Sequence, residues 1–151
     1  MPSASRTVKI NASPDVVLGV ITDFPAYPTF LPEMDECEVL RVERDANGEP
    51  LAFEVRFVVR VIRRLEYTLR LVRDENPAIR WSLVEGVFKV NDGSWVLEPL
   101  DGGTVTQATY SIDLGVGMFV PGNIVRSLVE KSLPDTLQRF KQEAERRTAS
   151  Q

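Results

Sequence analysis

The segment from residue 120 to residue 147 constrains the fold most, because no other stretch is long and periodic enough to form a principal helix. Its apolar residues recur mostly three or four positions apart and therefore share one helical face. They are Ile124, Val125, Leu128, Val129, Leu133, Leu137, Phe140 and Ala144. A stripe of this width needs a broad apolar partner, so the pattern predicts a long helix packed against a large surface.

Pro134 lies in the middle of this predicted helix. A proline there removes one backbone donor, so we expect the helix to bend and follow a curved partner. A functional hinge is the less favoured alternative. Ser132 and Asp135, three positions apart, also form a pattern that caps a helix start, so a restarted helix is a further interpretation.

The partner is predicted to be a β-sheet, because most of residues 36–113 read as strands. Apolar and polar residues alternate at 53–61 and again at 65–71, the period of strands with one buried face. The chain must reverse between these two strands near residues 61–64, although no glycine marks the turn. Further strands are expected at residues 6–10, 37–44, 79–83, 95–97 and 105–113, with 37–44 an edge or bulged strand because its alternation is imperfect.

Two turn signals compete after the strand at 79–83. One is Glu85-Gly86 and the other is Asn91-Asp92-Gly93. The Asp-Gly pair is the stronger hairpin signal, but the sequence alone does not decide which turn closes the hairpin.

The N-terminal part predicts two short helices after the first strand. Ser13, Pro14 and Asp15 form a strong helix start, and prolines at 25, 28 and 32 limit the next helix to a turn or two. The predicted fold class is therefore α+β: a curved antiparallel sheet of six or seven strands wrapped around the long C-terminal helix. The lengths agree, because a helix of about 27 residues spans ~40 Å and a nine-residue strand ~30 Å.

Two absences limit the chemistry of the chain. It has no histidine, which removes the commonest general base, the commonest transition-metal ligand and any Ser-His or Cys-His pair. Cys37 is the only cysteine, so no intrachain disulfide forms, and its place at a strand start favours a small buried residue over a nucleophile. We therefore assign no catalytic residue, metal or cofactor.

Charge and hydropathy indicate where the chain works and what it contacts. The net charge of −4 gives no general reason to expect nucleic acid or anionic membrane as a partner. The N-terminus lacks a signal-peptide pattern, and no run approaches 18 apolar residues. We expect a cytoplasmic protein with no transmembrane segment, in which residues 1–151 form one ligand-binding domain.

Several motifs carry a resemblance to a known family. They are ASP at residues 12–14, YPTFLP at 27–32, GVFK at 86–89 and GSW at 93–95, together with the amphipathic C-terminal segment. On these residues the chain resembles the START-like helix-grip superfamily. Within it, the chain is similar to the polyketide cyclase/dehydrase and lipid-transport family, which includes coenzyme Q-binding proteins. The resemblance covers about the whole chain.

The resemblance implies a hydrophobic cavity between sheet and C-terminal helix, and an apolar small molecule as ligand. Related proteins bind or move lipids, isoprenoid quinones or polyketides; some cyclise polyketides, and some bacterial relatives are described as ribosome-associating toxins. Periodicity alone instead favours a solid core. The predicted ligand-binding residues are Phe57, Tyr67, Trp81, Phe88, Trp95, Tyr110, Met118, Phe119, Val125, Leu128 and Val129.

Two further regions are predicted to lie beside the cavity. Met118 and Phe119 lie among glycines and are either a flexible apolar lid or ordinary core residues. On the helix, we expect a cavity-facing group and a group that anchors the helix to the sheet. The first is Val125, Leu128, Val129 and Ser132; the second is Leu137, Phe140 and Ala144.

Arg60, Arg63 and Arg64 cluster near the predicted turn. A solvated strand face is the favoured interpretation, with a lipid headgroup, an anionic membrane or RNA as alternatives. The first functional hypothesis is non-catalytic binding or transport of a lipid or isoprenoid quinone, with transient membrane contact left open. The second is a polyketide aromatase/cyclase, and the third is a ribosome- or protein-interaction module.

Overall fold

A curved antiparallel sheet forms the centre of the molecule. The computed structural model describes residues 3–75, 78–117 and 120–151. Seven strands pair in the order β1-β7-β6-β5-β4-β3-β2. They are β1 (Ser3–Ile10), β2 (Met34–Arg44), β3 (Pro50–Val61), β4 (Arg63–Asp74), β5 (Ala78–Gly86), β6 (Phe88–Leu100) and β7 (Val105–Val116). The predicted α+β fold class and the larger of the two predicted strand numbers are confirmed.

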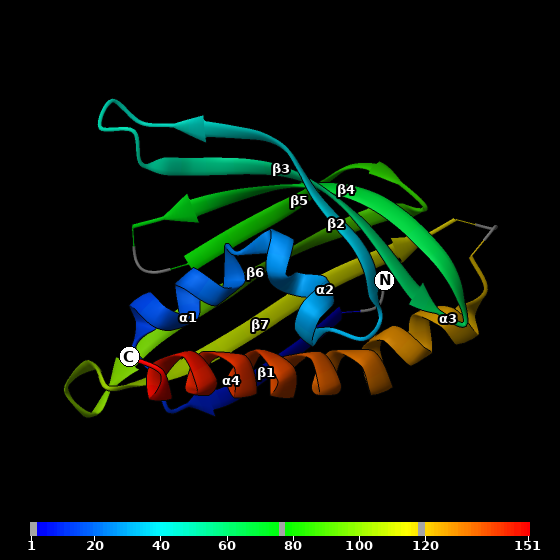
Figure 1. The fold of residues 1–151 in the computed structure, drawn as a ribbon. Coiled ribbons are helices and arrows are strands. Elements are labelled where there is room, and N and C mark those ends of the chain that lie inside the picture. Colours follow the sequence, from blue (N-terminus) through cyan, green and yellow to red (C-terminus); the bar gives the residue numbers. More distant parts are fainter. Residues whose placement is uncertain (1–2, 76–77, 118–119) are drawn as a thin grey trace.

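The helices lie on one face of the sheet, which curls around them (Figure 1). Between β1 and β2 lie α1 (Pro14–Ile21), the 3-10 turn η1 (Phe24–Ala26) and α2 (Tyr27–Phe30). The turn η2 (Asp101–Gly103) joins β6 to β7. The C-terminal helix consists of α3 (Gly122–Ser127), the π-helical turn η3 (Leu128–Ser132) and α4 (Leu133–Ala149). This is the predicted helix-grip arrangement, with short helices after the first strand and one long helix at the end.

The expected start of α1 is present in detail. The Ser13 hydroxyl accepts a hydrogen bond from the Val16 N–H at 3.3 Å, and Pro14 occupies the first turn. The prolines that follow confine the next segment to η1 and α2, three and four residues long. These short elements position Tyr27 against the end of the C-terminal helix, where its ring centre lies 5.4 Å from that of Phe140.

The expectation of an edge or bulged strand at 37–44 is confirmed. β2 pairs only with β3, and its register shifts between Met34 and Glu36, between Val39 and Arg41, and between Glu43 and Arg44. Such irregularities discourage an edge strand from pairing with other chains.

The reversal between β3 and β4 occurs at Ile62, within the predicted range. Val61 pairs with Arg63, so Ile62 alone forms the tip, with φ of 66°. A left-handed conformation is strained for a β-branched residue. Ile62 is also 66% exposed, so burial does not offset this strain.

The chain reverses between β5 and β6 at Val87, directly after Glu85-Gly86 at the end of β5, and the stronger sequence signal at Asp92-Gly93 proved wrong. Residues 91–93 lie inside β6 instead. The reason is packing: a β-carbon at position 93 would collide with the Trp81 ring and the Ser111 carbonyl oxygen. Gly93 is therefore required by a close contact across the sheet rather than by a turn.

Pro134 acts just inside the start of α4. The Leu133 N–H bonds to the Leu128 carbonyl, five residues back, which is the π-helical bond of η3. Because Pro134 has no N–H, the helix cannot continue its regular bonding at that residue. Figure 1 shows α3 inclined to α4. Ser132 makes no capping bond, so the restarted-helix interpretation is wrong.

A substitution at Gly93 tests the close contact with Trp81. We predict that Gly93→Ala lowers the free energy of unfolding by about 1–3 kcal/mol, because the added methyl group overpacks the site. The control is Gly19→Ala within α1, where a β-carbon meets no atom within 4 Å and helix propensity predicts stabilisation of up to ~1 kcal/mol. Urea denaturation measures both. Equal effects of the two substitutions would refute this role of Gly93.

A substitution at Ile62 tests the strain at the β3–β4 tip. We predict that Ile62→Asn raises the free energy of unfolding by about 1 kcal/mol, since asparagine tolerates positive φ. Ile62→Val keeps the branched side chain and should leave stability unchanged. Thermal and urea unfolding report both variants, and a less stable Asn variant would contradict the assignment of strain.

Candidate functional site

A pocket of about 180 Å³ lies between the sheet and the C-terminal helix. It separates two hydrophobic clusters through which the helix packs. One cluster contains Leu133, Leu137, Phe140 and Ala144, and the other contains Val120, Ile124 and Val125. The segment between them, with Leu128, Val129 and Ser132 of η3, borders the pocket. The helix is therefore anchored at both ends and leaves a space in the middle.

The structure brings together most of the residues predicted to bind ligand. Those that line the pocket are Phe57, Tyr67, Trp81, Phe88, Trp95, Tyr110, Leu128 and Val129. Val125 is buried in the adjoining cluster and is not among the lining residues. Met118 and Phe119 lie outside the described residues. The role of all eleven as ligand contacts stays a prediction.

The helix divides its faces much as expected. Ser132 borders the pocket with Leu128 and Val129, whereas Leu137 and Ala144 are buried in the core. Phe140 belongs to both groups: its side chain is only 4% exposed, and it also lines the pocket. Its ring centre lies 5.2 Å from that of Trp95. The helix end contacts α1 and β1 more than the central strands.

Six aromatic rings form a large part of the sheet side of the pocket, beside aliphatic residues of the same strands. Tyr67 stacks on Phe57 with ring centres 5.4 Å apart and meets Phe88 edge-on at 5.2 Å. The ring centre of Tyr110 lies 5.1 Å from that of Trp81 and 5.0 Å from that of Trp95. Edge-on and tilted pairs of this kind hold the rings in fixed orientations. The aromatic wall is thus both core and pocket lining, so the solid-core interpretation holds for the ring contacts but not for the pocket between them.

Asn91 is a polar residue in this wall that the sequence did not reveal. It is 4% exposed, and its side-chain oxygen accepts a hydrogen bond from the Trp81 indole N–H at 3.1 Å. An indole N–H only donates, so this bond fixes the amide orientation and leaves the Asn91 NH₂ as a donor. Among the described residues, β5 and β6 pair through residues 78–81 and 93–96. The Trp81–Asn91 bond therefore joins the strands just beyond the point where their backbone pairing stops.

The hydroxyl groups of Tyr67 and Tyr110 face the pocket. Among the hydrogen bonds between described residues, neither hydroxyl takes part, whereas the Tyr27 hydroxyl donates to the Ile21 carbonyl. No enclosed side-chain nitrogen or oxygen in the described part of the chain lacks a partner. The two hydroxyls must therefore be accessible, and the space beside them is the pocket that both residues line.

Burial keeps these groups protonated. It raises the pKa of Tyr67 and of Tyr110 well above the usual tyrosine range, because a phenolate loses its hydration in an apolar site. At neutral pH both residues are hydrogen-bonding hydroxyls and not bases. Burial likewise raises the pKa of the Cys37 thiol to about 12, which supports the prediction that it is no nucleophile.

Glu33 and Ser132 meet on the opposite side of the pocket. The Ser132 hydroxyl donates to the Glu33 carboxylate at 3.0 Å, joining the turn before β2 to η3. Both residues are partly exposed, line the pocket and directly follow an exposed residue, Pro32 or Lys131, so we infer that this pair marks the mouth of the pocket. Among the described residues that line the pocket, Glu33 is the only charged one. No local sequence pattern predicts this contact, because 99 positions separate the two residues.

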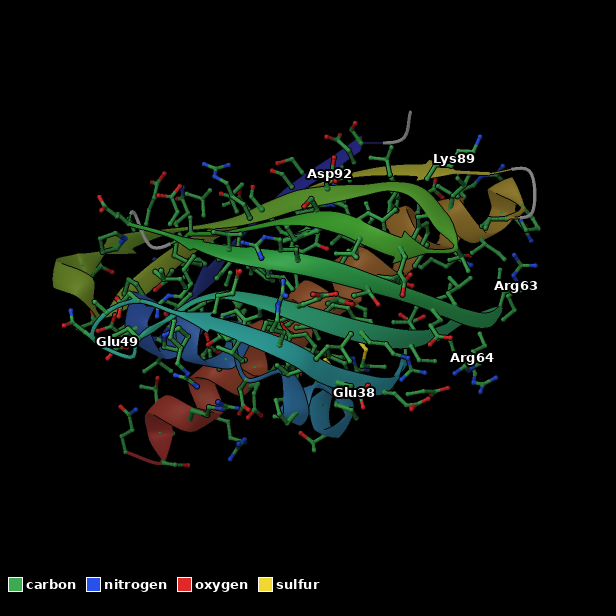
Figure 2. All side chains as sticks on the ribbon, turned by 90° about the horizontal axis from the view of Figure 1, so that it is seen from above. Glu38, Glu49, Arg63, Arg64, Lys89 and Asp92 are labelled. Carbon is green, nitrogen blue, oxygen red and sulfur yellow. The ribbon has the colours of Figure 1, made fainter. Side chains whose placement is uncertain are left out.

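The arginine cluster is balanced by carboxylates. Arg60 pairs with Asp35 at 3.0 Å, and Arg64 lies 3.5 Å from both Glu36 and Glu66. Figure 2 shows Arg63, Arg64 and Lys89 at one end of the molecule and Glu49 at the other. These ion pairs agree with the favoured interpretation of a solvated strand face.

The described residues offer neither a metal site nor a membrane-spanning helix. Within residues 3–75, 78–117 and 120–151, no group of three Cys, Asp or Glu side chains is placed to hold a metal ion. Among the helices of the same ranges, none combines the length and apolar character needed to span a membrane.

The chain is similar in sequence and in fold to known proteins. A family model described as polyketide cyclase/dehydrase and lipid transport matches residues 10–141. The persistence and stress-resistance toxin PasT from Escherichia coli is 31% identical over 100 residues, which are 66% of this chain. The match spans only 60% of that protein.

Two solved structures are similar over nearly their whole length. A START superfamily protein from Mycobacterium smegmatis has a TM-score of 0.80 at 24% identity, covering 95% of this chain and 97% of that one. The Zhui aromatase/cyclase from Streptomyces sp. R1128 has a TM-score of 0.82 at 22% identity, covering 97% and 95%. At these identities the similarity shows a shared fold.

The alkylation rate of Cys37 tests the raised pKa of its thiol. We predict that alkylation of the folded protein by iodoacetamide at pH 8 is at least about a hundredfold slower than alkylation of the urea-unfolded protein, because the raised pKa makes the thiolate scarce. The rate should rise steadily between pH 8 and pH 11. Equal rates in folded and unfolded protein would contradict the pKa shift.

Proposed function

The chain belongs to the polyketide cyclase/dehydrase and lipid-transport family, and from this we propose that it is a non-catalytic protein that binds or carries a hydrophobic small molecule. The ligand occupies the pocket between the sheet and the C-terminal helix. The observation that carries the proposal is the space itself: about 180 Å³ left open between two well-packed clusters.

An empty pocket would lower the free energy of unfolding of a protein of this size substantially. By extrapolation from cavity-creating substitutions, 180 Å³ of empty space forgoes roughly 4 kcal/mol of packing. A whole domain is stable by only about 5–15 kcal/mol. The pocket is therefore a feature that a core under selection for stability alone would have filled, and an apolar ligand recovers the lost contacts.

The size of the pocket limits what it takes. Sites for drug-sized ligands usually enclose about 300–1,000 Å³, so this one accommodates a small ring or the inserted end of a longer molecule. The remainder of a lipid or isoprenoid quinone would leave through the mouth beside Glu33 and Ser132. Apolar burial, about 25 cal/mol per Å², supplies most of the affinity.

A polyketide aromatase/cyclase is the second candidate. The observation that favours it is the placement of polar groups from Tyr67, Tyr110 and Asn91 on the sheet wall, away from the mouth. Cyclisation also needs a group that accepts a proton, and the two tyrosines are protonated at neutral pH. Among the described lining residues, the only carboxylate is at the mouth. Binding without catalysis therefore ranks first.

A substitution that fills the pocket tests the proposal. We predict that Val129→Phe weakens binding of apolar ligands at least about tenfold, because the ring occupies the space, and leaves the free energy of unfolding unchanged or increased, as cavity-filling substitutions do. Val84→Phe on the 49% exposed Val84 side chain is the matched control. Organic extracts of the heat-denatured native protein, analysed by mass spectrometry, should contain an apolar compound that extracts of the Val129→Phe variant lack.

Two results would contradict the proposal. One is an extract without an apolar compound from a native protein that also fails to bind fatty acids, quinones and small aromatic molecules in titrations. The other is equal binding by the Val129→Phe and Val84→Phe variants, which would place the ligand elsewhere.

A further inference from the structure

We propose that the pocket selects neutral ligands that carry a hydrogen-bond-accepting oxygen, such as a ketone, on the end that enters it, and that it discriminates against carboxylates. This inference rests on the proposed function and specifies the chemical class of its ligand. It follows from which polar groups line the pocket and from the absence of any lysine or arginine among its described lining residues.

The sheet wall offers donors that have no other partner. The Tyr67 and Tyr110 hydroxyls make no hydrogen bond with the described residues, and the Asn91 NH₂ is free because the side-chain oxygen is engaged by Trp81. The three groups come from β4, β6 and β7 and line the same pocket. An entering apolar group would strip water from them without replacing the hydrogen bonds, whereas a ligand oxygen replaces that water.

The position of Glu33 and Ser132 at the mouth disfavours a ligand with a carboxylate end, whichever end of the ligand enters first. If the carboxylate end of a ligand enters the pocket first, it reaches the aromatic wall. No cation among the described lining residues compensates its lost hydration there. A carboxylate that stays at the mouth lies beside Glu33, the charged residue of the lining, and like charges repel. A neutral oxygen avoids both penalties.

The polar groups and the size of the pocket together define suitable probes. A cavity of about 150 Å³ is large enough for benzene, so single-ring molecules fit within 180 Å³. Toluene, acetophenone and benzoate share one ring and differ at one substituent: apolar, neutral ketone and carboxylate. They separate the contributions of shape, hydrogen bonding and charge.

The two tryptophans provide the readout. The chain has only Trp81 and Trp95, and both line the pocket. A ¹⁵N-labelled sample should therefore show two indole N–H signals, each reporting directly on pocket occupancy. We predict that acetophenone shifts both signals at the lowest concentration, toluene at several times that concentration, and benzoate at more than about tenfold higher concentration.

Variants identify the groups responsible. Tyr67→Phe and Tyr110→Phe should each weaken acetophenone binding about fivefold, the usual effect of one lost hydrogen bond. Neither should weaken toluene binding, which makes toluene the control within each variant. Glu33→Gln should improve benzoate binding several-fold without changing acetophenone binding. The exposed Glu38 (labelled in Figure 2) does not line the pocket, so Glu38→Gln is the matched charge control.

The possible outcomes separate this inference from the function on which it rests. Shifts caused by all three probes at similar concentrations, or Tyr→Phe variants that bind acetophenone and toluene with unchanged preference, would overturn the selectivity and leave ligand binding intact. No shift with any probe would overturn both. Preference for acetophenone that disappears in the Tyr→Phe variants would support the inference.

Discussion

The C-terminal helix packs against the sheet at two separate places, and the rest of the structure depends on this arrangement. Leu133, Leu137, Phe140 and Ala144 anchor one end, and Ile124 and Val125 anchor the other. The middle is the π-helical turn, which forms directly before the proline. The two packed ends hold the helix and sheet together on either side of the pocket, which lies between the middle of the helix and the aromatic wall.

The chemistry of the pocket follows from where each wall originates. Alternate residues of β3–β7 point to the concave face and bring Phe57, Tyr67 and Tyr110 into contact with one another or with the tryptophans. Burial suppresses ionisation of the tyrosines. The helix and the turn before β2 contribute the polar mouth through Ser132 and Glu33. The result is an apolar space with neutral hydrogen-bonding groups inside and one negative charge at its entrance, which suits binding better than proton transfer.

The sequence predicted the parts of this structure that depend on local pattern. Period-two alternation identified Phe57, Tyr67 and Tyr110, and helical spacing identified Leu128, Val129 and Phe140. It missed Asn91, because an Asn-Asp-Gly run favours a turn locally, while the close contact of Gly93 with Trp81 keeps those residues in a strand. The Glu33–Ser132 contact joins residues that only the complete fold brings together, and no local signal predicts it. Pro134 indicated a disturbance of the helix but not that it would be a π-helical turn.

The most direct test of the account is a crystal structure of the native protein under xenon pressure. Xenon enters apolar cavities and is visible in diffraction maps. We expect a xenon atom, or a co-purified ligand in its place, between the aromatic wall of Trp81 and Tyr110 and the helix residues Leu128 and Val129. A pocket filled by the protein's own side chains, with no xenon or ligand there, would contradict it.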